Sequence, residues 1–487
     1  MKKEIPLEKS YGDDHVDDHV DKEIEDCFST KNPKCFFVFA GAGSGKTRSL
    51  INTLNFLDRE QGENLLMNGK QVAVITYTNA ACDEISRRLQ YKTIFSVSTI
   101  HSFLWDLIKY YQADIKSWLV ESVQKEIEEL QRKKTKKTGS KAGEKREEKI
   151  KKKMDRLAKI RTVQKFSYNP NGDNVGYDSL SHSEVIKMST EFIATEPTMQ
   201  DILTSKYPIL LIDESQDTKK ELIDALLIVC EKYSGKFIVG MFGDTMQKIY
   251  MDGKEDLAKC IPDNWIKPVK IMNHRSAKRI VTLANSIRST VDDKKQRARD
   301  DADEGIVRLF ITSESKDKEY IEKKVAEMMA QDTGDVGWND DDQYKSLILE
   351  HHMAASRFGF SELYMPLNDS KKFDTSLRDG SILELSILSK IVSPLVKAYK
   401  IGNDFEVAKI VRKNSPLLSK DAFVEEFKDQ TELLKNAEEA VETLMQLWND
   451  EKNLTCLEVL ESIQNTGLFD VGSRIDELLT EYSQDED

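Results

Sequence analysis

Short apolar runs alternate with amphipathic helical patterns along the first half of the chain. The runs are rich in β-branched and aromatic residues, as in "CFFVFA" and "ILLID", and they occupy 35–40, 72–77, 209–213, 237–242 and 269–272. Patterns with helical spacing separate them, for example "TRSLINTLNFL" and "KKELIDALLIVCEKY". Buried strands that alternate with helices indicate an α/β fold whose parallel sheet is covered on both faces.

The strand pattern is interrupted and later resumes, which predicts several domains. Residues 1–90 plus 205–277 are expected to form the first lobe, and 91–204 a helical insertion. A second α/β pattern follows over 278–378, with strands predicted at 305–312 ("GIVRLFIT") and 346–352 ("SLILEHH"). Residues 379–487 are acidic and contain only helical patterns, so they are expected to form a helical insertion domain.

Charge is distributed unevenly over the 487 residues, whose net charge is −13. Residues 121–165 carry 17 lysines and arginines against 8 acidic residues, a local net charge of +9. One basic arm on an acidic body suits local contact with nucleic-acid phosphates, but a solvated helical hairpin explains the same residues equally well.

The sequence contains no pattern typical of secreted or membrane proteins. The N-terminus lacks the apolar stretch of a signal peptide, and no segment reaches the ~20 apolar residues of a membrane helix. Six widely spaced cysteines fit neither a zinc site nor a disulfide framework. We therefore expect a cytoplasmic protein with no membrane partner.

A glycine-rich loop, "AGAGSGKT", follows the first apolar run directly. Glycines allow successive backbone N–H groups to surround phosphate oxygens at the N-terminus of a helix. Lys46 is expected to reach the β- and γ-phosphates, and the Thr47 hydroxyl to coordinate Mg²⁺. The alternative is an ordinary strand-to-helix turn, which leaves the Lys-Thr pair unexplained. The predicted nucleotide-binding residues are Ala40, Gly41, Ala42, Gly43, Ser44, Gly45, Lys46 and Thr47.

Two acidic residues end a later apolar run, in "YPILLIDESQD" (207–217). The carboxyl ends of neighbouring parallel strands converge on the ligand crevice, so these acids are expected beside the loop. Asp213 would hold Mg²⁺ and Glu214 would position the attacking water. An acidic surface cluster is the alternative, but it predicts no apolar strand before the acids. The two motifs together predict an ATPase that uses ATP and Mg²⁺.

At this point six segments, in order over residues 37–285, resemble the motifs of UvrD-like superfamily 1 DNA helicases. "AGAGSGKT" has the family's nucleotide loop, and "LLIDESQDT" is similar to its DExQDT box, with Ser215 in place of the usual aromatic residue. The other four are "VITYTNAACDEISRRL", "STIHSFLWDLI", "FGDTMQKIY" and "MNHRSAKRIVTLAN". The resemblance implies a P-loop NTPase with RecA-like motor lobes and helical insertion domains.

The resemblance also implies roles for residues outside the loop. Gln247 would contact the γ-phosphate and the acidic box, and Arg275 would enter the site as an arginine finger. The catalytic set is therefore Lys46, Glu214, Gln247 and Arg275. The residues expected to contact single-stranded DNA are Thr78, Asn79, His101 and Tyr250.

Three features depart from the family pattern. Residues 1–34 contain no glutamine that could recognise adenine, and "MDGKEDL" follows Tyr250 where the family has a second aromatic residue. No segment after residue 285 resembles the late helicase motifs, so the second lobe is expected to be incomplete in this chain.

The predicted function is an ATP-dependent DNA helicase or translocase, moving 3′→5′ on single-stranded or tailed duplex DNA. Two alternatives remain open. One is a nucleic-acid-sensing ATPase subunit that regulates a partner nuclease in phage defence. The other is a truncated fragment that binds ATP without unwinding.

Overall fold

The computed structural model describes residues 16–29, 31–132, 141–169, 177–244, 257–290, 293–312, 318–369, 377, 382–418, 430–448 and 454–471 of the 487-residue chain. The chain divides into two compact units. The first comprises residues 1–170 and 175–343, and the second comprises 171–174 and 344–487.

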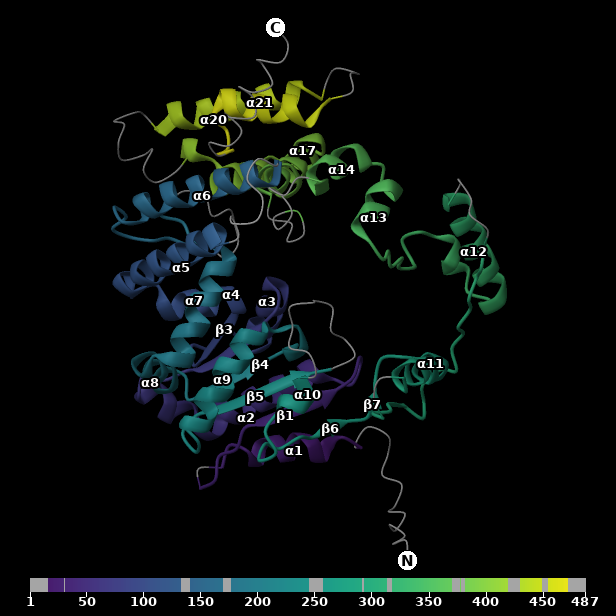
Figure 1. Ribbon diagram of the computed structural model, residues 1–487. Coiled ribbons are helices and arrows are strands. Elements are labelled where there is room, and N and C mark those ends of the chain that lie inside the picture. The colour runs from purple at the N-terminus through teal and green to yellow at the C-terminus, as the bar shows by residue number, and fades with distance from the viewer. Residues whose placement is uncertain are drawn as a thin grey trace, which may run out of the picture. The chain divides into compact units, whose positions relative to one another are not determined.

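A six-stranded parallel sheet forms the centre of the first unit (Figure 1). Its strand order is β3-β2-β4-β5-β1-β6. The pairing is regular; Phe36 of β1, for example, lies opposite Gly240 of β5. The strands span Phe36–Ala40 (β1), Val72–Thr76 (β2), Phe95–Thr99 (β3), Ile209–Ile212 (β4), Ile238–Gly243 (β5) and Val269–Lys270 (β6). The predicted P-loop NTPase α/β fold is therefore confirmed.

Alternate residues of each strand pack into two separate cores, because successive side chains of a strand point to opposite faces. Phe36 and Val38 of β1 face the core formed with helices α1 to α3, whereas Phe37 and Phe39 face the core formed with α4 to α9. The first group of helices spans Asp18–Asp26 (α1), Lys46–Met67 (α2) and Asn79–Arg88 (α3). Covering both faces is what makes the strands uniformly apolar.

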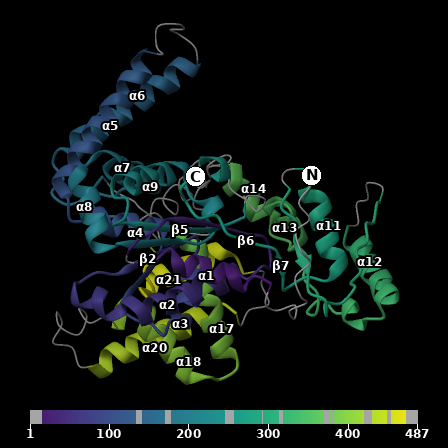
Figure 2. The same cartoon turned by 90° about the horizontal axis from the view of Figure 1, so that it is seen from below.

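The helices of the other face include the predicted insertion. They span Ile100–Ile108 (α4), Gln112–Arg132 (α5), Lys141–Ile160 (α6), His182–Thr195 (α7), Pro197–Lys206 (α8), Lys220–Lys232 (α9) and Leu257–Cys260 (α10). Helices α5 and α6 lie side by side as a hairpin that projects away from the sheet (Figure 2). Ile127 of α5 and Ile150 of α6 are buried and belong to the same apolar cluster as one face of the sheet, so this core continues into the hairpin.

The predicted start of the insertion at residue 91 is placed too early, because β3 (Phe95–Thr99) pairs with β2 in the main sheet. The segment "FSVST" alternates apolar and small polar residues, and its central residues are only half-buried at the edge of the sheet. An edge strand needs fewer apolar residues than a central one, so the apolar-run criterion missed it.

After β6 the chain forms a smaller substructure. Strands Met272–Asn273 (β7) and Arg297–Ala298 (β8) pair in parallel, and helix Lys278–Arg288 (α11) connects them. Helix α12 spans Lys318–Thr333 and is followed by the 3₁₀ turn Val336–Asn339.

The strands predicted at 305–312 and 346–352 are wrong. Residues 305–312 have no regular secondary structure, and Leu309 and Ile311 are exposed. Residues 346–350 are also irregular, and α13 begins at His351. A strand requires a neighbouring chain to satisfy its backbone N–H and C=O groups. No strand pairs with either segment in the described part of the chain.

The second unit is helical in its described part, which agrees with the helical patterns predicted for 379–487, but it also includes α13 and α14 from the segment 278–378 that was predicted to belong to the second lobe. Its helices span His351–Arg357 (α13), Ser361–Asp369 (α14), Leu383–Ile387 (α16), Ser393–Lys400 (α17), Asp404–Asn414 (α18), Gln430–Gln446 (α20) and Cys456–Thr466 (α21). A π-helical turn, Leu388–Val392, joins α16 to α17, and a 3₁₀ turn spans Pro416–Leu418. Leu395, Leu444 and Ile463 lie in its own apolar core. Across both units, none of the described helices is long and apolar enough to cross a membrane.

Candidate functional site

The glycine-rich loop joins β1 to α2 in the conformation expected of a phosphate cradle. Gly43 and Gly45 have φ values of +72° and +81°, which L-residues with side chains rarely adopt. The Ser44 hydroxyl donates to the carbonyl of Gly41 at 2.8 Å and closes the loop. Lys46 is the first residue of α2, so the positive end of the helix dipole and the lysine lie together. Such a loop can bind a polyphosphate.

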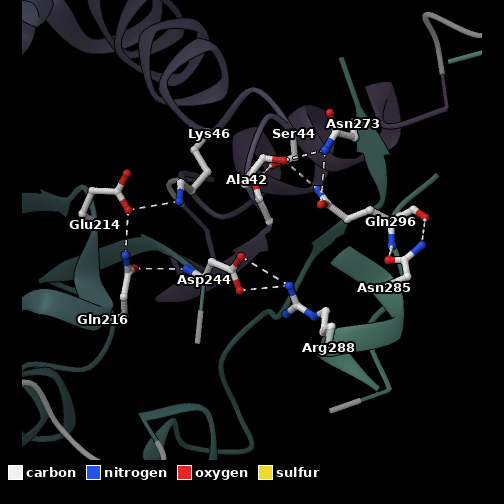
Figure 3. Close-up of polar contacts among 11 residues, drawn as sticks. Ala42, Ser44, Lys46, Glu214, Gln216, Asp244, Asn273, Asn285, Arg288 and Gln296 are labelled. Atoms are coloured by element: carbon white, nitrogen blue, oxygen red, sulfur yellow. Dashed lines mark hydrogen bonds and ion pairs between the residues drawn. The ribbon is translucent and has the colours of Figure 1, made fainter. Parts of the chain in front are cut away.

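The acidic residues follow β4 and reach the same place. The Lys46 ammonium donates to Glu214 Oε2 at 3.0 Å, although 168 residues separate the two in sequence (Figure 3). Glu214 has φ +49° and ψ +47°, an uncommon backbone conformation for a residue with a side chain. Its N–H donates to Asp213 Oδ1 at 3.0 Å. The parallel sheet thus brings the predicted lysine and glutamate into direct contact.

Asp213 is buried, and its environment changes its acidity. Burial, followed by the neighbouring charge of Glu214, raises the pKa of Asp213 to about 6. The two predicted Mg²⁺ ligands follow β4 and begin α2, where Thr47 lies half-buried in the first turn. A carboxylate and a hydroxyl are oxygen donors of the kind that Mg²⁺ prefers, so the chemistry of Asp213 and Thr47 is compatible with the prediction.

Gln216 connects the acidic residues to the next strand. Its Nε2 donates to Glu214 Oε2 at 2.8 Å, and its Oε1 accepts the N–H of Asp244 at 3.1 Å. Gln216 lies in "DESQD" and Asp244 in "FGD", but no role was predicted for either residue. Their membership of these two motifs is the feature of the sequence from which a role could have been predicted.

The segment around β7 holds the outer side of the loop. Asn273 Nδ2 donates to the carbonyl of Ala42 at 2.9 Å, and the N–H of His274 donates to the carbonyl of Gly43 at 2.9 Å. Asn273 Oδ1 also accepts the N–H groups of Arg275 and Ser276. Asn273 therefore fixes the turn that carries Arg275, and the sequence analysis had not singled it out.

This turn places Arg275 beside the loop. A Cβ added at Gly43 would lie 2.9 Å from the Cβ of Arg275. The arginine side chain is exposed. Its position next to the phosphate loop is compatible with the predicted finger. Gln247 and Tyr250, which were predicted to act in catalysis and DNA binding, lie outside the described residues.

Two carboxylates near α1 accept hydrogen bonds from the segments that flank the phosphate loop. Asp17 accepts the N–H groups of Ile271 and Met272, at the junction between β6 and β7. Asp21 accepts hydrogen bonds from Ser49 and Asn52 of α2. Both residues lie within 1–34, the segment that contains no glutamine that could recognise adenine.

The predicted DNA contacts follow β2 and β3 at one edge of the sheet. Thr78 caps α3 by accepting the N–H of Ala81, and Asn79 is exposed in the first turn of that helix. His101 lies in the first turn of α4, with its ring centroid 5.0 Å from that of His182. Burial, the charge of His182 and the charge of Lys219 lower the pKa of His101 to about 4.

The basic arm forms the α5–α6 hairpin. Lys153 pairs with Glu126 across the hairpin, and Arg156 pairs with Glu184 of α7 at 2.7 Å. These pairs are structural because they join helices. Lys149, Lys151 and Lys152 are exposed on α6.

Comparisons with known proteins agree with the nucleotide site. The family model described as an AAA domain matches residues 24–252, which include the loop and the acidic box. The chain is also similar to the Gabija protein GajB of Bacillus cereus (strain HuB5-5). The two are 26% identical over 512 aligned residues, which cover 91% of this chain and 72% of GajB. Together, these findings support an enzyme of the ATPase or helicase type built on a P-loop.

Proposed function

We propose that this chain hydrolyses ATP and uses the energy to move along single-stranded DNA in the 3′→5′ direction. The contact between Lys46 and Glu214 is the observation that carries the ATPase part. It joins the residue that would neutralise the β- and γ-phosphates to the residue that would orient the attacking water.

The other residues of the site have distinct tasks in this proposal. The loop N–H groups and α2 bind the triphosphate, and Asp213 with Thr47 holds Mg²⁺. The metal ion supplies charge neutralisation of the phosphate oxygens. Arg275, carried on the turn that Asn273 fixes, stabilises negative charge that develops on the transferred phosphoryl group.

The nucleic-acid part rests on the resemblance to UvrD-like helicases and on where the matching residues lie. Thr78, Asn79 and His101 follow neighbouring strands of one sheet, so they can face the same strand of DNA. The α5–α6 hairpin adds exposed lysines that can contact phosphates.

ATPase measurements with and without single-stranded DNA test this proposal. We expect turnover to be stimulated by DNA and abolished in Lys46→Ala, with a loss of roughly 10²–10³-fold or more because phosphate-charge stabilisation disappears. Circular dichroism of the variant checks that the fold is intact. Hydrolysis at the wild-type rate in Lys46→Ala would contradict the assignment of the loop.

The similarity to the Gabija protein GajB favours a second candidate. In this candidate the chain is an ATPase subunit that senses nucleic acid and regulates a partner nuclease. DNA-stimulated ATPase activity without movement along the strand, together with a nuclease gene next to this one, would support it. ATP-driven movement along single-stranded DNA, measured as displacement of streptavidin from a biotinylated end, would favour the translocase.

A further inference from the structure

A chain of polar contacts leads from the phosphate loop to helix α11 (Figure 3). Lys46 and Gln216 both donate to Glu214 Oε2, at 3.0 and 2.8 Å. Gln216 Oε1 accepts the N–H of Asp244. The carboxylate of Asp244 then pairs with Arg288 of α11, with Nη1 at 3.1 Å from Oδ1.

Gly243 makes the central link possible. A Cβ at this position would lie 2.5 Å from Ser215 Oγ and 2.9 Å from Gln216 Oε1. Any side chain there would displace Gln216 from the N–H of Asp244. The Gly-Asp pair at the end of β5 therefore has two tasks, since Gly243 admits Gln216 and Asp244 binds Arg288.

The link is buried along most of its length. Gln216 is 3% exposed, and the side chains of Asp244 and Arg288 are 3% and 10% exposed. Polar contacts shielded from water are electrostatically stronger than exposed ones, and the loss of one partner leaves the other unsatisfied. The Glu214 side chain is 39% exposed, so the shielded part of the link runs from Gln216 to Arg288, and a change that reaches Gln216 is passed on to Asp244.

We propose that Gln216 and Arg288 are positioning residues that couple the occupancy of the nucleotide site to helix α11. The proposal rests on the proposed binding of ATP. A bound triphosphate attracts Lys46, so Glu214 Oε2 loses a cationic partner and keeps the amide of Gln216.

The Gln216 amide moves with Glu214, and this movement shifts the N–H of Asp244. The Asp244–Arg288 pair then carries the shift into α11, the helix between β7 and β8. Arg275 lies on the turn just before α11, so the same shift reaches the predicted finger.

Hydrogen exchange of residues 278–288 tests the coupling without requiring turnover. The probe is a non-hydrolysable ATP analogue with Mg²⁺, applied to the full chain. In the wild type the analogue should change exchange of α11 by roughly fivefold or more, the lower end of ordinary coupling between sites. In Gln216→Met and in Arg288→Gln this difference should disappear, while the affinity for the analogue stays within about threefold.

Three further variants make the test specific. Arg279→Gln changes an exposed arginine of the same helix, paired with Glu304 at 3.5 Å, and should keep the wild-type response. Arg288→Lys retains a cation and should restore part of the response if Arg288→Gln loses it. Gly243→Ala should uncouple α11 as Gln216→Met does, because the added methyl group displaces Gln216, although the variant removes no polar side chain.

Gln216→Met should also lower kcat while KM for ATP stays nearly constant.

The outcomes separate the two proposals. An analogue-induced change that persists in Gln216→Met and Gly243→Ala would overturn the coupling, and so would an equal loss in Arg279→Gln. A third outcome would show that the contacts only stabilise the fold. In that case Arg288→Gln would melt at a much lower temperature than the wild type, while Gln216→Met would keep the wild-type hydrogen exchange and kcat. Failure of the wild type to bind the analogue would instead refute the proposed function.

Discussion

Glu214 occupies an uncommon backbone conformation in which a lysine and an amide share one of its carboxylate oxygens. Such conformations cost free energy and often occur at functional sites. In this conformation the Glu214 carboxylate points toward Lys46 and the phosphate loop. Glu214 must lie close to the loop if it is to orient water near the phosphates.

Glu214→Gln is expected to separate binding from hydrolysis. The amide preserves the size of the side chain and can still accept from Lys46, but it cannot act as a base. Turnover should fall by roughly 10²–10⁴-fold while ATP binding remains, so the variant should retain bound ATP. Filter binding of labelled ATP and a coupled ATPase assay measure the two properties. Loss of ATP binding would contradict this role.

His101 is expected to make the stability of the fold depend on pH. Its folded pKa of about 4 lies below the ordinary value of 6.5, so the unfolded chain binds the proton more readily. The stabilisation from neutral His101 is complete above pH 6.5 and is lost as the pH falls toward 4. The loss should be on the order of 1–3 kcal/mol.

Urea unfolding between pH 7.5 and pH 5 measures this effect. The free energy of unfolding of His101→Gln should decrease less over this range than that of the wild type. Parallel curves for the two proteins would show that His101 does not titrate in a buried site.

The α5–α6 hairpin is the element on which the sequence left two readings open. The structure reduces the number of lysines available to DNA, because Lys153 pairs with Glu126 within the hairpin. It also leaves Lys149, Lys151 and Lys152 exposed along α6. We therefore test the phosphate-contact hypothesis first at these three exposed lysines of α6.

Replacing Lys149, Lys151 and Lys152 with Gln should weaken binding of single-stranded DNA. The slope of log affinity against log salt should become shallower by roughly 2, because each lost phosphate contact removes about 0.7. Lys153→Gln is the matched control and should leave the slope nearly unchanged. Fluorescence anisotropy over a salt series measures it, and an identical slope in the triple variant would favour the solvated hairpin.

At the scale of the molecule, the two halves of the predicted motor differ. The first has a complete parallel sheet, whereas β7 and β8 form a two-stranded sheet of two residues each. Val307, Leu309 and Ile311 are exposed on the segment that was predicted to add a strand. Separation of a duplex requires a second lobe that closes firmly on ATP, and in the described part of the chain the sheet of this lobe is limited to these two short strands.

We therefore expect the 487-residue chain by itself to bind ATP, to hydrolyse it slowly and not to separate a 3′-tailed duplex. Strand separation monitored with a fluorophore and quencher pair tests this, with a UvrD-like helicase as positive control. ATP-dependent unwinding by the chain without a partner would contradict the expectation.

The sequence by itself determined the features that depend on local pattern. The apolar runs predicted β1, β2, β4 and β5, since a strand buried on both faces must be apolar throughout. The loop from Ala40 to Thr47 and the acids Asp213 and Glu214 were identified because strand-end chemistry follows from strand order.

Only the tertiary structure decided features that depend on a distant neighbour. Residues 305–312 have the composition of a strand, but no strand pairs with them in the described part of the chain, so they remain irregular. Gln216 and Asp244 lie in segments that resemble helicase motifs, Arg288 lies in none of them, and the first and the last are 72 positions apart. Their roles arise because the ends of β4 and β5 and helix α11 meet in a buried place, where each polar group must find a partner.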